Sequence, residues 1–462
     1  MKLIRNLIIL AVILVAFLPF ILGFEIENRY RGLIAELETQ GYRLDSHEYA
    51  RGFYDAKAKS TFTLPVNMPD GENLDLSLTI SSDIKHGPYT LNDGWFGQLA
   101  HFKTAFFYED QALLGDETGE QVQTEIHFNG DGYTRIDIPA LAQAKQLDDE
   151  LMLDFKGLSG DANFNTNKGH IAMQLSGEGL SVYSPGKGRL DINSYSLNSD
   201  STRGINDLML GSGDFLIDRI NFKDTETDIA IELNNFKVEA DTSARDEVLD
   251  LKATYSFDRL MVAEQEYGSA LLQVSFDSIS AAAVAKIQES IKEMQQNQVP
   301  AEQQGMAMMG TFMGVLPALL ERNPGIAIDN LQVTTPQGDV KFSFSLKAQD
   351  MKVTDVSIPQ SMLQKLVGDA KLEVPESIVR DALKQMAIQQ QLAAIQNIDD
   401  PENAIDFVKS DEMADLQVIS QIDMVLTQGF VEKKGESLVS VASLKAGLLS
   451  INGKTIPLPP LQ

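Results

Sequence analysis

Apolar and polar residues alternate along much of the chain, and this pattern restricts the fold more than any other feature of the sequence. The alternation is clearest in residues 74–81, 171–175, 229–233, 249–257 and 340–347. Successive side chains of a strand point to opposite faces of a sheet, so a period of two predicts strands with one packed and one solvated face. Sheets of this kind are mostly antiparallel. We therefore predict a mainly β fold with helices (α+β).

Turn residues separate the alternating segments. Asn129-Gly130 lies between two of them and predicts a β-hairpin, and further turns are expected at residues 335–338 and 452–453. Across residues 150–280 strands follow one another with little helix between them. We therefore expect an extended antiparallel meander that forms one curved sheet.

Helical periodicity is confined to the two ends of the chain. Ile26, Tyr30, Leu33 and Leu37 recur at spacings of three and four, which predicts a helix just after the apolar N-terminus. In the C-terminal third, helices are expected over the following segments: 284–294, 305–320 (broken by Pro317) and 379–386 (opened by Pro375). The expected domains are an anchor (1–24), a β-rich region with short helices (25–280) and a mixed helix and strand region (281–462) that continues the same sheet.

The N-terminus has the charge pattern of a membrane anchor. Lys2 and Arg5 precede an uncharged apolar run over residues 7–24, and Glu25 and Glu27 follow it. At about 1.5 Å per residue, a helix over this run approaches the roughly 30 Å of a bilayer's hydrocarbon core. The basic residues predict a cytoplasmic N-terminus, and either an anchor or a cleaved signal peptide would export the rest of the chain. We favour the single transmembrane anchor, because the run is long for a signal peptide and lacks an Ala-x-Ala exit.

Charge and the absence of cysteine exclude several classes of protein. Among 462 residues, 66 acidic side chains outnumber 38 basic ones, and the formal net charge is −28. Such a surface repels nucleic acid, so no nucleic-acid partner is expected. A chain without cysteine cannot form disulfides, thiolate zinc sites or iron–sulfur clusters.

Motifs for catalysis, metals and cofactors are incomplete. His47 begins a pattern like that of a zinc-binding helix, but Arg51 stands where the second histidine belongs. Residues 129–131 resemble the start of a calcium loop but lack a glutamate at its twelfth position. Lys454 follows a glycine as in a phosphate loop whose upstream glycine is missing, and Ser159 lacks the second spacer of a nucleophile elbow. We therefore predict no catalytic residue, no metal site and no cofactor.

Arg51 is the polar residue with the strongest individual claim to a role. It alternates with Tyr49 and Phe53, so the three side chains are expected on one face. One interpretation is an anion or partner contact beside aromatic walls. The interpretation that we favour is an arginine stem that covers aromatic surface and pairs with a local acid.

The uncharged, methionine-rich run over residues 305–320 suggests an apolar contact. It contains Met306, Met309, Phe312 and Met313, and methionine adapts to variable apolar shapes. A buried core helix is the favoured interpretation. The alternative is a helix that lies over an apolar ligand or touches the bilayer, with these four residues making the contact.

Five short motifs, in this order and after an apolar N-terminus, resemble those of the YdgA-like family of bacterial envelope proteins over nearly the whole chain. The motifs are Tyr49-Ala-Arg51-Gly52-Phe53, His86-Gly87-Pro88, Asn323-Pro324-Gly325-Ile326, Thr335-Pro336-x-Gly338 and Asn452-Gly453-Lys454. The resemblance implies a Gram-negative inner-membrane protein with its bulk in the periplasm. It implies no activity and no catalytic residues.

Two classes of function fit these features. The first is a non-catalytic, membrane-anchored periplasmic protein that acts through contacts with a protein partner or a second copy in organising the envelope. The alternative is a protein that binds or carries lipid or another apolar ligand along its curved sheet. A periplasmic hydrolase would need a catalytic constellation that these motifs do not supply.

Overall fold

The computed structural model describes most of the chain. The described residues are 2–39, 42–67, 73–87, 89–90, 95–96, 98–108, 111–112, 121–141, 143–146, 151–296, 301–356, 358–395 and 407–456. They form two compact units, unit 1 (Met1–Ala230 and Ala281–Val315) and unit 2 (Ile231–Ser280 and Leu316–Gln462). The domain boundaries expected at residues 24 and 280 stay predictions.

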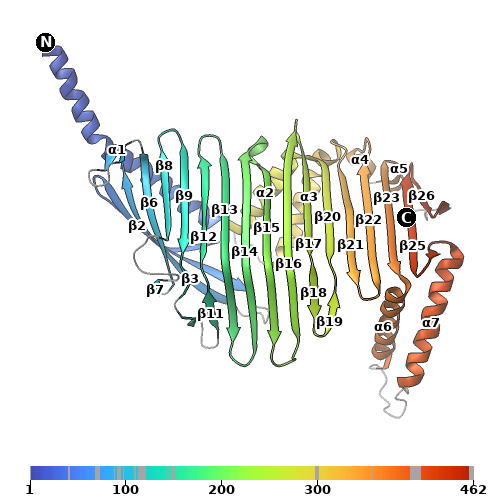
Figure 1. Ribbon diagram of the computed structural model, residues 1–462. Helices are drawn as coiled ribbons and strands as arrows, with labels where there is room; N and C mark the ends of the chain where they lie inside the picture. The colour runs from blue at the N-terminus through green and yellow to red at the C-terminus, as the bar shows by residue number, and fades with distance from the viewer. Residues whose placement is uncertain are drawn as a thin grey trace. The chain divides into compact units, whose positions relative to one another are not determined.

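Unit 1 contains an antiparallel meander (Figure 1). Its long strands lie in the order β1-β2-β3-β6-β8-β9-β12-β13-β14-β15, so neighbours in space are neighbours along the chain apart from short interruptions. The long strands are β1 (Arg43–Arg51), β2 (Asp55–Asn67), β3 (Asn73–His86), β6 (Gln98–Tyr108), β8 (Val122–His127), β9 (Asp131–Ile138), β12 (Leu158–Asn165), β13 (His170–Ser184), β14 (Gly188–Arg203) and β15 (Met209–Asp224). The short elements are β4 (Tyr89–Thr90), β5 (Trp95–Phe96), β7 (Gln111–Ala112), β10 (Lys145–Gln146), β11 (Met152–Phe155) and the 3-10 turn η1 (Ile205–Asp207).

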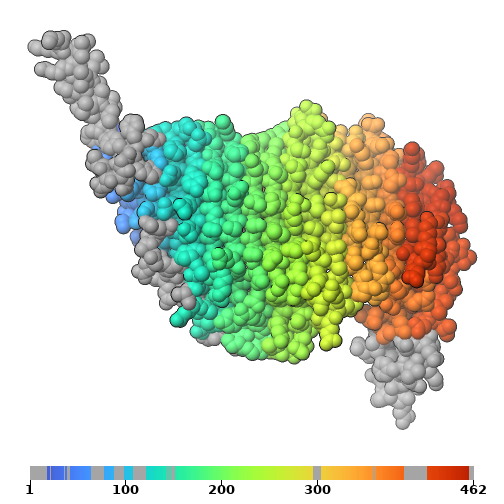
Figure 2. All heavy atoms as spheres, in the orientation of Figure 1, coloured from blue at the N-terminus to red at the C-terminus, as the bar shows by residue number. Residues whose placement is uncertain are grey.

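The predicted hairpin is confirmed. β8 and β9 pair antiparallel across a turn in which Gly130 takes a φ of +84°, and the Asn129 side chain accepts a hydrogen bond from the Asp131 backbone N–H at 3.1 Å. A left-handed φ suits glycine, which has no Cβ to clash. On the face of unit 1 turned to the viewer in Figure 2, β13, β14 and β15 form adjacent bands of atoms with no described helix over them.

Helix α1 (Lys2–Thr39) packs on the first strands of unit 1. Ile26, Tyr30 and Ile34, one turn apart, are buried in a core with residues of β2, β3 and β6. Leu33, expected on this stripe, is instead exposed, because Ile34 takes the inward position. The greater part of the expected span over residues 7–24 falls on side chains outside the described ones. Among the described residues, no helix combines the length and the apolar character needed to cross a membrane.

Unit 2 contains a second antiparallel meander, in the order β16-β17-β20-β21-β22-β23-β25-β26-β27. Its strands are β16 (Ala230–Arg245), β17 (Val248–Phe257), β18 (Arg259–Val262), β19 (Gln265–Tyr267), β20 (Ala270–Ser280), β21 (Gly325–Thr335), β22 (Gly338–Ala348), β23 (Leu366–Pro375), β24 (Glu432–Lys434), β25 (Ser437–Lys445), β26 (Leu448–Ile451) and β27 (Lys454–Ile456). Every described strand pair in either unit is antiparallel. The predicted α+β fold, mainly β, is confirmed.

The helices of the C-terminal third are confirmed as a class and corrected in detail. They are α2 (Ala281–Gln296), α3 (Ala301–Leu320), α4 (Val353–Val356), α5 (Pro359–Gln364), α6 (Glu376–Ile395) and α7 (Phe407–Gln428). The expected break at Pro317 was wrong, because α3 continues through that residue. Pro375 ends β23, and α6 begins at the next residue. Helix α7 was not expected as a separate element.

Candidate functional site

One face of the unit 2 sheet is apolar across six strands, and we call it the apolar face. The backbone pairings place residues of successive strands directly opposite one another, so each row below shares that face. The rows are Tyr255-Leu272-Leu331-Phe342-Leu372-Ser440, Ala253-Val274-Ile328-Phe344-Ala370-Ala442 and Leu251-Phe276-Ile326-Leu346-Gly368-Leu444. Ser440 is the single polar side chain in these rows.

Helices cover the apolar face at the two ends of the strands. At one end α6 and α7 pack on Val374 and Leu438, with Val418 and Ile422 fully or almost fully buried. At the other end, Leu320 and Met351 pack on Ala348. Between these two clusters the cover is incomplete: Tyr255, Phe276, Ile326 and Leu372 are 39% to 42% exposed. A sheet normally buries its apolar face against another layer. Part of this face is not covered in that way and remains exposed apolar surface.

A pocket of about 410 Å³ opens where the apolar face meets α6 and α7. This volume lies in the range of about 300–1,000 Å³ that is usual for small-molecule sites. Its lining is apolar apart from two residues. The lining residues are Leu372, Val374, Val379, Leu383, Ile422, Met424, Val425, Val431 and Leu438, together with Gln421 and Ser440. Such a pocket has only two polar side chains that could orient a polar ligand. Its largely apolar lining suits a hydrocarbon chain instead.

The predicted methionine-rich helix is α3, and the favoured interpretation of it as a buried core helix was wrong. Met306, Met309, Phe312 and Met313 are 47% to 74% exposed, and they share one side of the helix. Val315 and Leu320 provide the buried side instead. An uninterrupted apolar run reads as core because its sequence does not show which neighbours cover it.

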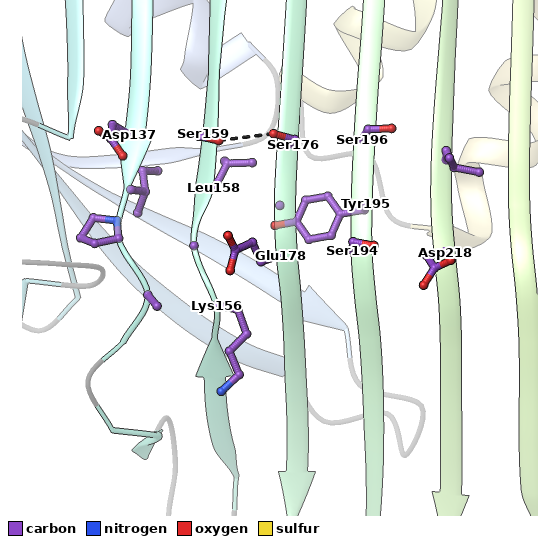
Figure 3. A pocket seen from close by; sticks show the side chains of 16 residues that line it. Asp137, Lys156, Leu158, Ser159, Ser176, Glu178, Ser194, Tyr195, Ser196 and Asp218 are labelled. Atoms are coloured by element: carbon purple, nitrogen blue, oxygen red, sulfur yellow. Dashed lines mark hydrogen bonds between the residues drawn. The ribbon is translucent and has the colours of Figure 1, made fainter.

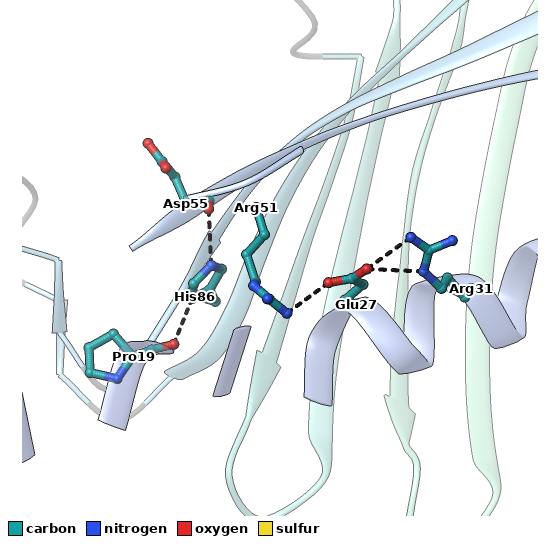
Figure 4. A network of polar contacts seen from close by, with 6 residues as sticks. All are labelled: Pro19, Glu27, Arg31, Arg51, Asp55 and His86. Atoms are coloured by element: carbon teal, nitrogen blue, oxygen red, sulfur yellow. Dashed lines mark hydrogen bonds and ion pairs between the residues drawn. The ribbon is translucent and has the colours of Figure 1, made fainter. Parts of the chain in front are cut away.

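Arg51 lies at the junction of α1 with the unit 1 sheet (Figure 4). Its Nη1 donates to Glu27 Oε2 at 2.8 Å, and its guanidinium carbon lies 3.3 Å from the ring centroid of Phe24. Glu27 also accepts from Arg31. The structure thus has the arginine covering an aromatic ring and paired with a local acid, as the favoured interpretation held. An anion or partner contact at Arg51 stays a prediction and would compete with Glu27.

His86, at the end of β3, fastens α1 to the sheet. Its Nδ1 lies 3.0 Å from the carbonyl oxygen of Pro19 in α1, and its Nε2 lies 3.0 Å from that of Asp55. Gly23 makes room for the ring, since a Cβ there would come within 2.6 Å of its Cε1. A neutral imidazole donates to one carbonyl alone, whereas an imidazolium donates to both. Burial nevertheless dominates and lowers the pKa of His86, against the opposing effect of the two carbonyls.

A polar hollow of about 620 Å³ lies on the unit 1 sheet across β9, β12, β13, β14 and β15 (Figure 3). A row of polar side chains crosses it, with Ser159 Oγ 3.3 Å from Ser176 Oγ. Glu178 and Asp218 add acidic groups. Ser159 is held in strand β12 instead of on a strand-to-helix turn, and the residues that line the hollow include no histidine to act as its base. We assign no catalytic role to this hollow.

Among the described residues, no cluster of three or more histidine, aspartate and glutamate side chains could hold a metal ion.

Comparison with protein families identifies the family of this chain. Residues 1–459 match a family described as bacterial proteins of unknown function (DUF945). The chain belongs to this DUF945 family. Membership identifies a bacterial protein whose family likeness extends over both units, and the description of the DUF945 family carries no catalytic activity. No curated protein and no solved structure matches the chain.

Sequence reasoning missed the pocket beside α6 and α7. Its signal was present: Ala414, Val418 and Ile422 recur every fourth residue and are buried. The alternation in β17, β20, β22 and β23 likewise indicated an apolar face. The extent of that face depends on strand register, which the backbone pairings reveal.

The exposure of α3 predicts that charge is tolerated on its methionine side. Met309→Glu and Met313→Glu should melt within a few degrees of the wild type, because both side chains already meet water. Val315→Glu, on the same helix, should destabilise the fold by several kcal/mol, because it buries an unpaired charge. Thermal melting by circular dichroism compares the three. Equal melting of all three variants would contradict the orientation of α3.

The burial of His86 predicts a stability that rises with pH. The folded protein holds the ring neutral to a lower pH than the unfolded chain does, so protonation favours unfolding as pH falls through about 6.5 and below. His86→Gln should therefore lose part of the decline in melting temperature between about pH 7.5 and pH 5. Burial lowers the pKa of His47 as well, so some decline remains. An unchanged pH slope in His86→Gln would show that this histidine does not titrate with unfolding.

Proposed function

We propose that this protein is a non-catalytic, membrane-anchored protein of the bacterial envelope that binds acyl chains of lipids on the apolar face of unit 2. The observation that carries the proposal is the incomplete cover of this face between its two helical ends. Four large side chains there remain 39% to 42% exposed, in rows that are apolar apart from Ser440 and the Tyr255 hydroxyl.

The chemistry of the face favours a hydrocarbon chain over a polar ligand. Moving each methylene from water into an apolar site contributes about 0.8 kcal/mol, so affinity grows with the length of chain in contact. An unbranched chain can lie across several strands along one row and end in the pocket beside α6 and α7. The lysines of these strands lie on the opposite, solvated face, where Lys341 pairs with Asp339 and Lys371 with Glu373 of the same strand.

The proposed location rests on the N-terminus. Lys2 and Arg5 before the apolar run, and Glu25 and Glu27 after it, support a cytoplasmic N-terminus and a periplasmic bulk. The narrower likeness to YdgA-like proteins supports the inner membrane of a Gram-negative bacterium. A lipid-binding protein attached there would have its ligand in the adjacent bilayer.

A second candidate function is contact with a partner protein or a second copy. The observation in its favour is the exposed side of α3 formed by Met306, Met309, Phe312 and Met313. Methionine side chains are common in surfaces that adapt to a partner. Lipid binding is preferred because the apolar face has both a larger extent and a pocket.

The test is the lipid content of Leu372→Glu against that of Val441→Glu. Leu372 lies on the apolar face and lines the pocket, whereas Val441, on the neighbouring strand, pairs with Lys371 and so faces the opposite side. Both side chains are exposed, so both variants should fold. Native mass spectrometry after extraction in a mild detergent should find lipid in the wild type and in Val441→Glu, and several-fold less in Leu372→Glu.

Equal lipid content in all three proteins, each with a wild-type melting curve, would contradict binding on the apolar face. A wild type that carries no lipid, but forms a defined complex through α3, would favour the second candidate.

A further inference from the structure

Four aromatic side chains form an exposed cluster where α1 meets the first strands of unit 1, and we call it the aromatic collar. Phe20 and Phe24 come from α1, and Phe53 and Tyr54 from the turn between β1 and β2. The ring centroids lie 5.2 Å apart for Phe20 and Phe24, 6.0 Å for Phe20 and Phe53, and 4.7 Å for Phe53 and Tyr54. All four side chains are 38% to 47% exposed.

Ordered polar groups border the collar. The Arg51 guanidinium lies over the Phe24 ring and pairs with Glu27, so its position is fixed beside the collar. Pro19 and His86 hold the helix against the sheet at the same place. Tyrosine and arginine are typical of the interface between hydrocarbon and water in a membrane, and phenylalanine is common on the apolar side of helices that lie at this interface.

We propose that the aromatic collar inserts into the headgroup region of a lipid bilayer and seats unit 1 on the membrane surface. The proposal rests on the membrane attachment proposed above. Phe20 and Phe24 belong to the last part of the uncharged run over residues 7–24. A helix over this run has a length near the roughly 30 Å of the hydrocarbon core, so its last turn falls at the interface. The stacking of Phe53 on Phe20 brings the β1–β2 turn to the same depth.

Charge also favours a bilayer as the occupant. Residues 25–59 carry six basic and seven acidic side chains, a net charge of −1, within a chain of −28. An anionic membrane surface repels the rest of the chain far more strongly than it repels this segment. The segment that carries the collar is therefore nearly neutral, and it adds little to the repulsion between the chain and such a surface.

The experiment measures the depth of Phe53 in vesicles. The full chain carries Trp95→Phe, which removes its single tryptophan, together with Phe53→Trp or the control Phe222→Trp. Phe222 is similarly exposed but lies near the far end of β15, away from the β1–β2 turn. Vesicles of phosphatidylcholine and phosphatidylglycerol contain a lipid brominated in the upper acyl chain. We expect the tryptophan introduced at position 53 to be quenched several-fold more than that at position 222.

Each outcome decides the inference. If the protein floats with the vesicles and both positions are quenched equally, the proposed insertion of the collar is wrong, and the proposed membrane anchor is unaffected. If the protein does not float, both the insertion of the collar and the membrane anchor are wrong. The lipid content measured for Leu372→Glu remains an independent test of ligand binding. A blue shift at position 53 that follows protein concentration without vesicles would mean that a second copy covers the collar, and would also overturn it. Melting curves of both variants verify their folding.

Discussion

Hydrogen bonding between antiparallel neighbours fixes which side chains share a face, and the other features of both units depend on it. Once Tyr255 is opposite Leu272, and Leu272 opposite Leu331, the alternation in each strand places every second residue on the same face. The rows of unit 2 then add up to one apolar face that needs cover. Helices supply that cover at the two ends of the strands, and the middle remains open. In this account the lipid completes the layer that the helices leave unfinished.

Much of the architecture could be predicted from the sequence because strand periodicity is a local property. The alternating segments correspond to β3, β13, the start of β16, β17 and β22, and the Asn129-Gly130 turn joins β8 and β9. Helices α2 and α6 were expected because helical periodicity is local as well. What could not be predicted is which surfaces meet. Leu33 and Ile34 both fit a helical stripe, and only packing against β2 and β3 selects Ile34. The methionine side of α3 looks like core in sequence and is exposed in the fold.

For the candidate sites as well, single residues could be predicted from the sequence, but their partners could not. Arg51 and its aromatic neighbours could be singled out, but Glu27 and Phe24, which hold the guanidinium, lie on another element and become its partners only when α1 packs on the sheet. His86 was noticed in a Gly-Pro turn, yet its contacts to Pro19 and Asp55 come from two distant segments. Both sites connect the helix to the sheet. This junction links the proposed membrane attachment to the β-rich unit 1, and it depends on the small Gly23 as much as on the polar side chains.

Photolabelling with a fatty acid that carries a diazirine in its chain tests most directly whether the apolar face binds hydrocarbon. The account predicts that mass spectrometry of digested, labelled protein finds adducts in peptides containing Tyr255, Phe276, Ile326 and Leu372, and that excess unlabelled fatty acid removes them. Adducts confined to the solvated face of the same strands, or labelling that excess fatty acid does not reduce, would contradict it.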